Sequence, residues 1–252
     1  MPSAAGSIPA LWFDELDSTN AEARRRAEAG EGGPLWIAAR RQTSGRGRRG
    51  RTWESGQGDL AATLLTTTTK GPAQAAQLSF VAALAVRDLA SRYVPDALVR
   101  LKWPNDLLIA GAKAAGILIE SGRREDRALW LAVGVGVNLA AAPEGLDYPA
   151  TSLAAHLRPE AAGAPAPEAA LQVLAEGFAR WLDLWEREGF APLRAAWTQY
   201  ALGLGARCVA RLGEREVHGV AVEMDADGAL VLRLDSGGHQ RITAGDVFFG
   251  NP

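Results

Sequence analysis

The sequence predicts an α+β fold, with a mixed β-sheet flanked by helices over residues 1–202 and a small SH3-like β-barrel over residues 203–252. Three observations lead to this expectation. Apolar spacing typical of helices recurs over residues 72–93 and 168–201. Short apolar runs typical of strands lie before and between these helices. Beyond residue 203, short alternating segments follow one another closely, separated by glycine-rich turns.

The first third of the chain predicts one helix and two strands. The apolar run 11–13 leads to Ser18, Thr19 and Asn20, three good N-cap residues, and the segment after them predicts a helix that ends at Gly30. Residues 34–39 and 59–69 are predicted strands, because apolar and β-branched side chains dominate them. An arginine-rich loop connects these two strands.

The rest of the chain alternates between helices and strands. Residues 72–93 have helical composition, and strands are expected over 105–110, 114–121 and 127–138. A connection rich in Pro, Ala and Gly over 158–168 leads into two helices, roughly 168–187 and 190–201. The remaining residues predict about five strands, since turns such as "DADG" and "DSGG" separate their alternating segments.

Composition excludes several classes of protein. The formal net charge of -2 gives the whole molecule no general attraction for polyanions, so six arginines between Arg40 and Arg51, with no acid among them, indicate a local anion site. Cys208 is the only cysteine, which favours a reducing compartment. The sequence has no secretory signal pattern and no run of about 18 apolar residues. We therefore expect a soluble, cytoplasmic protein that does not enter a membrane.

Residues 45–50, "GRGRRG", match the G-x-G-x-x-G dinucleotide pattern, but the context is wrong because no helix opens at the last glycine. A disordered RGG segment is disfavoured as well, since two apolar strands bracket the loop. A glycine-rich loop that carries Arg46, Arg48, Arg49 and Arg51 suits phosphate recognition, and Trp53 offers a flat face for a ring. A solvated basic loop without a ligand is the alternative.

The lysines mark a second candidate site. Only three of 27 basic residues are lysine, and Lys102 and Lys113 lie in one short segment. The first belongs to "KWPND", a proline corner that presents Asn105 and Asp106 beside it; a polar turn is the alternative. Alternation in "KAAGILIE" places Lys113 on the face of Ala115, Ile117 and Ile119, opposite Gly116 and Leu118. A buried ammonium there needs an anionic partner, unless Lys113 caps the strand and reaches water.

Five stretches in a fixed order give the sequence a family resemblance. "DSTN", "QTSGRGRRGRTW", "KWPNDLLI", "KAAGILIE" and "GVGVNL" closely resemble the biotin protein ligases, strongly over roughly residues 11–140. The resemblance implies a class II synthetase-like biotin/lipoate ligase fold, with residues 1–202 as the catalytic biotin- and ATP-binding domain. It also implies a two-step reaction: biotin and Mg·ATP give biotinyl-5′-adenylate, and a lysine of a biotin carboxyl carrier protein, from acetyl-CoA carboxylase or a related carboxylase, then takes the biotin.

The resemblance assigns roles to individual residues. Those expected to bind biotin are Ser18, Thr19, Asn20, Gln42, Gly45, Arg46, Gly47, Arg48, Lys113, Gly116 and Ile117. Those expected to bind ATP are Arg46, Arg48, Arg49, Arg51, Trp53, Lys102, Asn105, Asp106, Lys113 and Asn138. Arg48, Lys113 and Asp106 are the expected catalytic residues, with Asp106 also serving Mg²⁺ and accepting the proton of the carrier lysine.

Two departures from the family pattern stand out. Gly56 replaces the proline of the usual "W-x-S-P", which predicts a more mobile loop exit, and "DSTN" begins at residue 17, which predicts a short form without an operator-binding domain and hence no sequence-specific DNA binding. The sequence does not determine the oligomeric state and is compatible with a homodimer. Two other functions are weighed: a lipoate or octanoate ligase or transferase of the same fold, and a nucleic-acid-binding module that uses the arginine loop.

Overall fold

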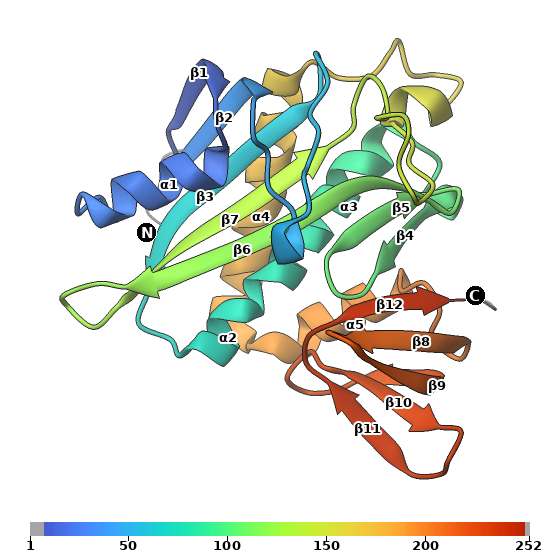
Figure 1. Ribbon diagram of the computed structural model, residues 1–252. Helices are drawn as coiled ribbons and strands as arrows, with labels where there is room; N and C mark the ends of the chain where they lie inside the picture. The colour runs from blue at the N-terminus through green and yellow to red at the C-terminus, as the bar shows by residue number, and fades with distance from the viewer. Residues whose placement is uncertain (1–7, 250–252) are drawn as a thin grey trace.

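The computed structural model describes residues 8–249 and contains two β-sheets (Figure 1). The larger sheet has seven strands and includes those predicted in the first 140 residues. Its order is β1-β2-β3-β7-β6-β5-β4, with β1 parallel to β2 and every other pair antiparallel, so the predicted mixed sheet is confirmed. The strands are β1 (Ala10–Leu16), β2 (Leu35–Gln42), β3 (Leu60–Thr68), β4 (Val99–Lys102), β5 (Asp106–Ile109), β6 (Ala112–Arg123) and β7 (Leu129–Val137). The short strand β4 was not predicted.

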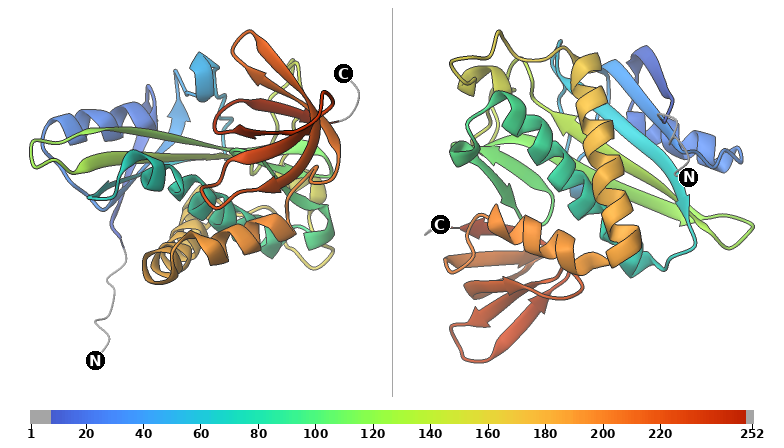
Figure 2. Two further views of the ribbon diagram at one scale, coloured as in Figure 1. Left: turned by 90° about the horizontal axis from the view of Figure 1, so that it is seen from below. Right: turned by 180° about the vertical axis from the view of Figure 1, so that it is seen from behind.

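Helices cover both faces of this sheet because its strands are apolar on both sides. On β2 and β3, Ile37 and Leu65 pack toward α1 (Thr19–Glu28), whereas Ala38 and Leu64 belong to the main core under α3 (Leu78–Tyr93) and α4 (Pro167–Glu188). Figure 2 shows α3 and α4 side by side on the face opposite α1. The sheet is therefore a middle layer with helices on both faces.

The helix predicted over 72–93 is two helices, α2 (Pro72–Ala76) and α3, that meet at Gln77. The Gln77 side chain accepts a hydrogen bond of 2.9 Å from the Trp185 indole of α4, which fixes the junction against the neighbouring helix. The two later helices are found as expected, α4 followed by α5 (Phe190–Gln199), with Gly189 between them at φ +76°. Positive φ of this kind suits glycine and separates the two helices.

The C-terminal residues form a second, antiparallel sheet of five strands in the order β11-β10-β9-β8-β12. The strands are β8 (Arg207–Leu212), β9 (Arg215–Met224), β10 (Leu230–Leu234), β11 (His239–Ile242) and β12 (Asp246–Phe249). Within the described residues the edge strands β11 and β12 do not pair, so this part is SH3-like in strand number but is not a closed barrel. The expected closure is the one feature of this sheet that differs.

The second sheet packs directly on the larger unit. The buried Trp103 indole, in the corner between β4 and β5, donates a hydrogen bond of 3.0 Å to the Gly228 carbonyl of the second sheet. Cys208, Val217 and Met224 lie in the same continuous apolar core as the main sheet. Residues 1–7 and 250–252, the outer limits of the two predicted domains, lie outside the described residues. Among residues 8–249, no helix is long and apolar enough to cross a membrane.

Candidate functional site

A cavity of about 370 Å³ opens where the larger sheet, the arginine loop and the second sheet meet. In Figure 1 the loop between β2 and β3 crosses in front of β6 and β7. The start of α1, the loop, the 102–106 corner and β6 and β7 contribute to the lining, and β12 contributes from the second sheet. Arg48 and Lys113 are far apart in the sequence but were predicted to contact the same ligand, and both line this cavity. Its size suits a small organic ligand.

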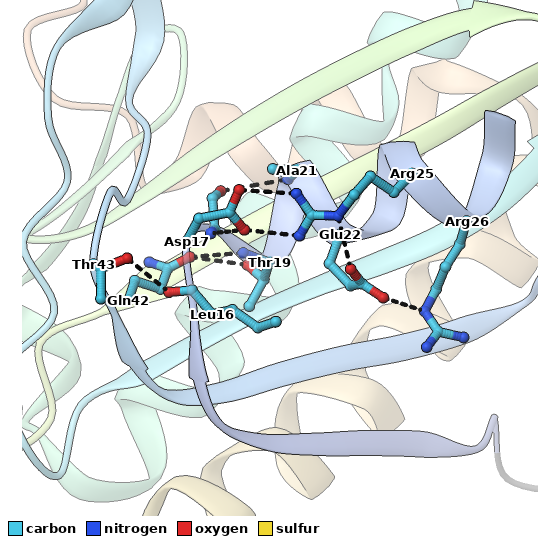
Figure 3. A network of polar contacts seen from close by, with 10 residues as sticks. Leu16, Asp17, Thr19, Ala21, Glu22, Arg25, Arg26, Gln42 and Thr43 are labelled. Atoms are coloured by element: carbon cyan, nitrogen blue, oxygen red, sulfur yellow. Dashed lines mark hydrogen bonds and ion pairs between the residues drawn. The ribbon is translucent and has the colours of Figure 1, made fainter. Parts of the chain in front are cut away.

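One end of the cavity is a network of buried, uncharged hydrogen-bonding groups around the start of α1. The Thr19 backbone and hydroxyl both donate to Gln42 Oε1, at 2.9 and 3.2 Å, as Figure 3 shows. Ser18 is the helix N-cap, and its Oγ accepts from Ala21 N at 3.5 Å. Ser18, Thr19 and Asn20 are each no more than 4% exposed. These four predicted residues are therefore brought together and held before any ligand arrives.

Two residues that the sequence analysis missed extend this network: Thr63, which is uncharged, and Glu120, a carboxylate that also pairs with Arg46 at 3.5 Å. The Thr63 hydroxyl lies 2.8 Å from Thr19 Oγ1 and donates to Asn20 Oδ1 at 2.7 Å, and Asn20 Nδ2 donates to Glu120 Oε2 at 2.9 Å. A Cβ added at Gly134 would lie 2.1 Å from Asn20 Oδ1, so the glycine makes room for Asn20. The signal for Thr63 was present in the sequence, since a threonine interrupts the apolar run of β3.

The floor of the cavity is a pair of glycines under Trp53. Gly116 on β6 faces Gly136 on β7, and the Trp53 ring lies over both. A Cβ at Gly136 would meet the indole at 2.3 Å, and one at Gly116 would meet it at 3.1 Å. Ile117, the other predicted floor residue, lines the cavity but belongs to the core, and its backbone carbonyl accepts from Asn105 Nδ2 at 2.8 Å. Glycines on adjacent strands thus provide a flat surface for a ring.

Lys113 lies on the opposite face of β6 from the one predicted by alternation. The pairing of β5 with β6 shifts register here, because Leu107 pairs with Ala115 and Leu108 with Lys113. The extra residue, Ala114, forms a bulge that turns Lys113 to the cavity side, within reach of Gly116. The expectation that Lys113 shares a face with Ala115 is therefore wrong, and the bulge is the reason.

The anionic partner that a buried Lys113 needs is Asp106. Lys113 Nζ lies 2.8 Å from Asp106 Oδ1, in the geometry of an ion pair rather than of an aligned hydrogen bond. The ammonium also lies 5.5 Å from the ring centres of Trp53 and Tyr148. Lys102 lies opposite Asp106 in the backbone register of the β4–β5 hairpin. Burial lowers the pKa of Lys102, although the negative charge of Asp106 acts to raise it. Lys113 is therefore ion-paired with Asp106, while Lys102 lines the same cavity with its ammonium 5.5 Å from the centre of the Phe248 ring.

The arginine loop is a small hairpin stabilised by its own backbone. Gly47 N donates to Arg51 O at 2.7 Å and Trp53 N donates to Gly45 O at 2.9 Å. At the tip Arg49 and Gly50 have φ of +55° and +74°, and a Cβ at Gly45 would lie 2.2 Å from the Trp53 carbonyl. The glycines are thus required by the turn and by the close approach of the two arms.

The loop arginines contact the second sheet and the corner residues. Arg48 donates to Asn105 Oδ1 at 3.0 Å and to Gly245 O at 2.9 Å, and burial lowers the pKa of Arg48. Arg49 and Arg51 both pair with Asp246 of β12, at 3.2 and 2.6 Å. Sequence reasoning missed Asp246, which lies 195 residues from Arg51 and belongs to none of the recognised motifs.

Four predicted site residues lie outside this convergence. Arg46 lines the cavity but turns away from the other arginines, toward Glu120 at 3.5 Å, and its side chain is half exposed. Gly45 and Arg49 line a cleft under the loop, not the main cavity. Asn138 lines a small neighbouring cavity together with Trp53, Lys113 and Tyr148. Its Nδ2 donates to Thr151 O at 2.9 Å, while its buried Oδ1 has no partner among the described residues.

The carboxylates of the site limit what metal it can hold. Within residues 8–249 there is no cluster of three His, Cys, Asp or Glu side chains that could form a metal cage. Asp147 and Asp246 line the cavity as well, but Asp246 is paired with Arg49 and Arg51, and Asp106 is the carboxylate beside Lys113. A single carboxylate fits Mg²⁺ that arrives with nucleotide phosphates, because Mg²⁺ keeps most of its ligands from phosphate and water.

Comparison with known proteins places the chain in a family. Residues 12–138 match the biotin/lipoate A/B protein ligase family, and residues 203–250 match the biotin protein ligase C-terminal domain. The chain is 46% identical to a biotin–[acetyl-CoA-carboxylase] ligase of Paracoccus denitrificans, over 93% of this chain and 98% of that protein. It is 32% identical to the bifunctional ligase/repressor BirA of Bacillus subtilis, over 95% of this chain and 74% of that protein.

Among solved structures, the biotin protein ligase of Aquifex aeolicus in complex with biotin and ATP is similar, with a TM-score of 0.79 and 25% identity over 97% of this chain and 99% of that one. The match spans both sheets. The chain therefore belongs to the biotin/lipoate A/B protein ligase family.

Proposed function

We propose that this protein is a biotin protein ligase, which activates biotin with ATP and transfers it to a lysine of a biotin carrier protein. The observation that carries the proposal is one cavity with two chemically different ends. Buried neutral groups around Thr19 and Gln42 form one end, and Arg48, Lys102 and Lys113 bring positive charge to the other. A ligand with an uncharged polar ring and a carboxylate, such as biotin, matches both ends.

In the first step the biotin carboxylate attacks the α-phosphorus of ATP, a carboxylate–phosphorus bond forms, and pyrophosphate leaves with the electron pair. This step brings two anions together, so nearby cations must offset their repulsion and the developing charge. Lys113 is placed to do so, because its ammonium lies above the glycine floor beside Trp53. We assign Arg48 the α-phosphate and Trp53 and Asn138 the adenosine.

In the second step the ε-amine of the carrier lysine attacks the acyl carbon, and AMP leaves. The amine must lose a proton, and we assign this to Asp106, the carboxylate 2.8 Å from the Lys113 ammonium. Bound Mg²⁺ would neutralise phosphate charge, with Asp106 as its protein ligand. Before ATP arrives Asp106 is paired with Lys113, so the nucleotide must compete for this ion pair.

The relatives indicate the carrier and the setting. A biotin–[acetyl-CoA-carboxylase] ligase is the relative with 46% identity, and we propose the biotin carrier domain of that carboxylase as the protein substrate. The net charge of -2 and the pairing of Arg49 and Arg51 with Asp246 favour a small anion over DNA as the ligand of the loop. We propose a cytoplasmic enzyme, with residues 1–202 catalytic and residues 203–252 as a separate C-terminal domain.

Exchange of labelled pyrophosphate into ATP tests the proposal. Biotin is expected to support exchange, while lipoate and octanoate, offered at the same concentration, are not. Exchange supported by lipoate but not by biotin would assign the chain to the lipoate branch of the family instead. Transfer of labelled biotin to a purified carrier domain, with its target lysine changed to arginine as control, tests the second step.

A further inference from the structure

Asp59 is a buried carboxylate, 3% exposed, immediately before β3. Its Oδ2 accepts from Gly56 N at 3.0 Å, and its Oδ1 accepts from Leu139 N at 2.8 Å and from Ala140 N at 3.0 Å. Among the described residues no Lys, Arg or His side chain forms an ion pair with it. The backbone N–H groups therefore provide its stabilisation, against a burial that raises the pKa of Asp59.

The two segments that Asp59 connects are far apart in sequence. Gly56 lies at the exit of the arginine loop, three residues after Trp53, whereas Leu139 and Ala140 directly follow Asn138. The chain next to each of these contacts lines the small cavity beside Lys113: residues 52–54 come shortly before Gly56, and Asn138 directly precedes Leu139, with Pro143, Leu146 and Tyr148 further along. One carboxylate thus bonds to both stretches of chain that lead into the cavity lining.

We propose that Asp59 is a positioning residue for the nucleotide half of the pocket: it fixes the distance between the loop exit and the segment after β7, and so the space between Trp53 and Tyr148. This rests on the proposed function, which assigns adenosine to Trp53 and Asn138. The biotin end has its own bonds, and among the described residues Gln42 Nε2 to Ser55 Oγ, at 3.2 Å, is the side-chain hydrogen bond that joins it to the loop exit. The affinity for ATP should therefore depend on Asp59 much more than the affinity for biotin.

Asp59→Asn tests this with a minimal change. An amide has one acceptor oxygen, which can keep the hydrogen bonds from Leu139 N and Ala140 N. Its NH₂ group then points at the Gly56 N–H, so two donors face each other and the bond from Gly56 is lost. We expect the KM for ATP in pyrophosphate exchange to rise about tenfold, as for loss of a charge-assisted hydrogen bond, and the KM for biotin to change less than about twofold. Amide hydrogen exchange should become faster at residues 52–56, and more weakly at 139–148.

Asp225→Asn is the control for loss of a backbone-binding carboxylate, although Asp225 also pairs with Arg241. Asp225 also accepts two backbone N–H bonds, from Asp227 at 2.9 Å and Ala229 at 3.0 Å, but in the β9–β10 turn of the second sheet. It should lower thermal stability without altering either KM or exchange at residues 52–56. A second variant, Gly56→Pro, removes the Gly56 donor and places the proline ring against Asp59 Oδ2, while the bonds from Leu139 and Ala140 to Oδ1 remain. It should change amide exchange at the loop exit alone.

The outcomes separate this inference from the proposed function. Unchanged exchange at both segments in Asp59→Asn would overturn the inference, as would equal rises in the two KM values or a fall in kcat alone. If wild-type protein showed no biotin-dependent pyrophosphate exchange, the proposed function would fail. Amide exchange would even then decide whether Asp59 holds the two segments together.

Discussion

The two ends of the pocket are built by different physical means. The neutral end consists of short hydrogen bonds among buried side chains at the start of α1 and on β2 and β3, such as Thr19 with Gln42. The charged end depends on a loop whose arginines bond to Asn105, Gly245 and Asp246. The first is part of the sheet's own packing, and the second exists only if two sheets are correctly assembled.

This difference indicates which end is rigid. Buried, mutually satisfied hydrogen bonds hold side chains in one arrangement, because breaking any of them leaves an unsatisfied polar group. Arg49 and Arg51 are about two fifths and half exposed, and pairs of exposed ions contribute little stability each. The neutral end is therefore held in one arrangement, while the exposed pairs of Arg49 and Arg51 with Asp246 constrain the loop only weakly.

Lys113→Arg should have the largest effect, because Lys113 serves the point where the two ends meet. A planar guanidinium cannot replace a compact ammonium between Asp106, Trp53 and Tyr148. We expect single-turnover adenylate formation to slow by about 100-fold, the usual cost of one well-aimed donor. Lys70→Arg is the control, since Lys70 lies over Trp185, far from the pocket. A near-normal rate would show that Lys113 is incidental.

Arg48→Gly tests the charged end. The variant loses the bonds to Asn105 and Gly245, so the loop should no longer cover the intermediate. Adenylate should still form but should leave the protein about tenfold faster or more, as expected for loss of charge-assisted hydrogen bonds. Retention of labelled adenylate after rapid gel filtration measures this. Arg49→Gly, which changes a more exposed arginine outside the main cavity, should have less effect; equal retention in all three proteins would contradict the assignment.

Gly134→Ala tests the neutral end. Its Cβ would lie 2.1 Å from Asn20 Oδ1, so Asn20 must move and the bond from Thr63 is disturbed. We expect the KM for biotin to rise about tenfold, equivalent to one lost buried hydrogen bond, with the KM for ATP little changed. Gly71→Ala is the control, since nothing lies within 4 Å of the added methyl. Parallel rises in both KM values would argue against separate ends.

Asp17→Asn should have the smallest effect and concerns stability alone. Its pair with Arg25, seen in Figure 3, lowers the pKa of Asp17 from 3.8 to about 2, but both side chains are about half exposed. We expect a loss of about 0.5 kcal/mol at pH 7 after allowance for solvent screening. Because the folded pKa is depressed, the contribution is present above pH 3.8 and disappears as pH falls through about 2. Urea unfolding at several pH values measures it.

The sequence predicted those features that local patterns determine. Neighbouring residues were enough to predict the cap at Ser18, the strands around the arginine loop and the alternation of the second sheet. The sequence motifs also predicted that Arg48 and Lys113 lie at one site, and both line the same cavity. The face of Lys113 was mispredicted, because a bulge at Ala114 is decided by pairing with β5. Asp246 and Asp59 were missed for a related reason: their roles depend on contacts with residues about 200 and 80 positions away.

The Trp103 side chain gives the second sheet a mechanical connection to the chemistry. Its indole is bonded to Gly228, while its chain neighbour Lys102 and the nearby Asn105 line the cavity. The position of the C-terminal sheet and the positions of Lys102 and Asn105 in the cavity are therefore linked through one side chain. If a carrier domain docks on that sheet, the Trp103–Gly228 bond is the direct route by which docking would displace the cavity residues next to Trp103.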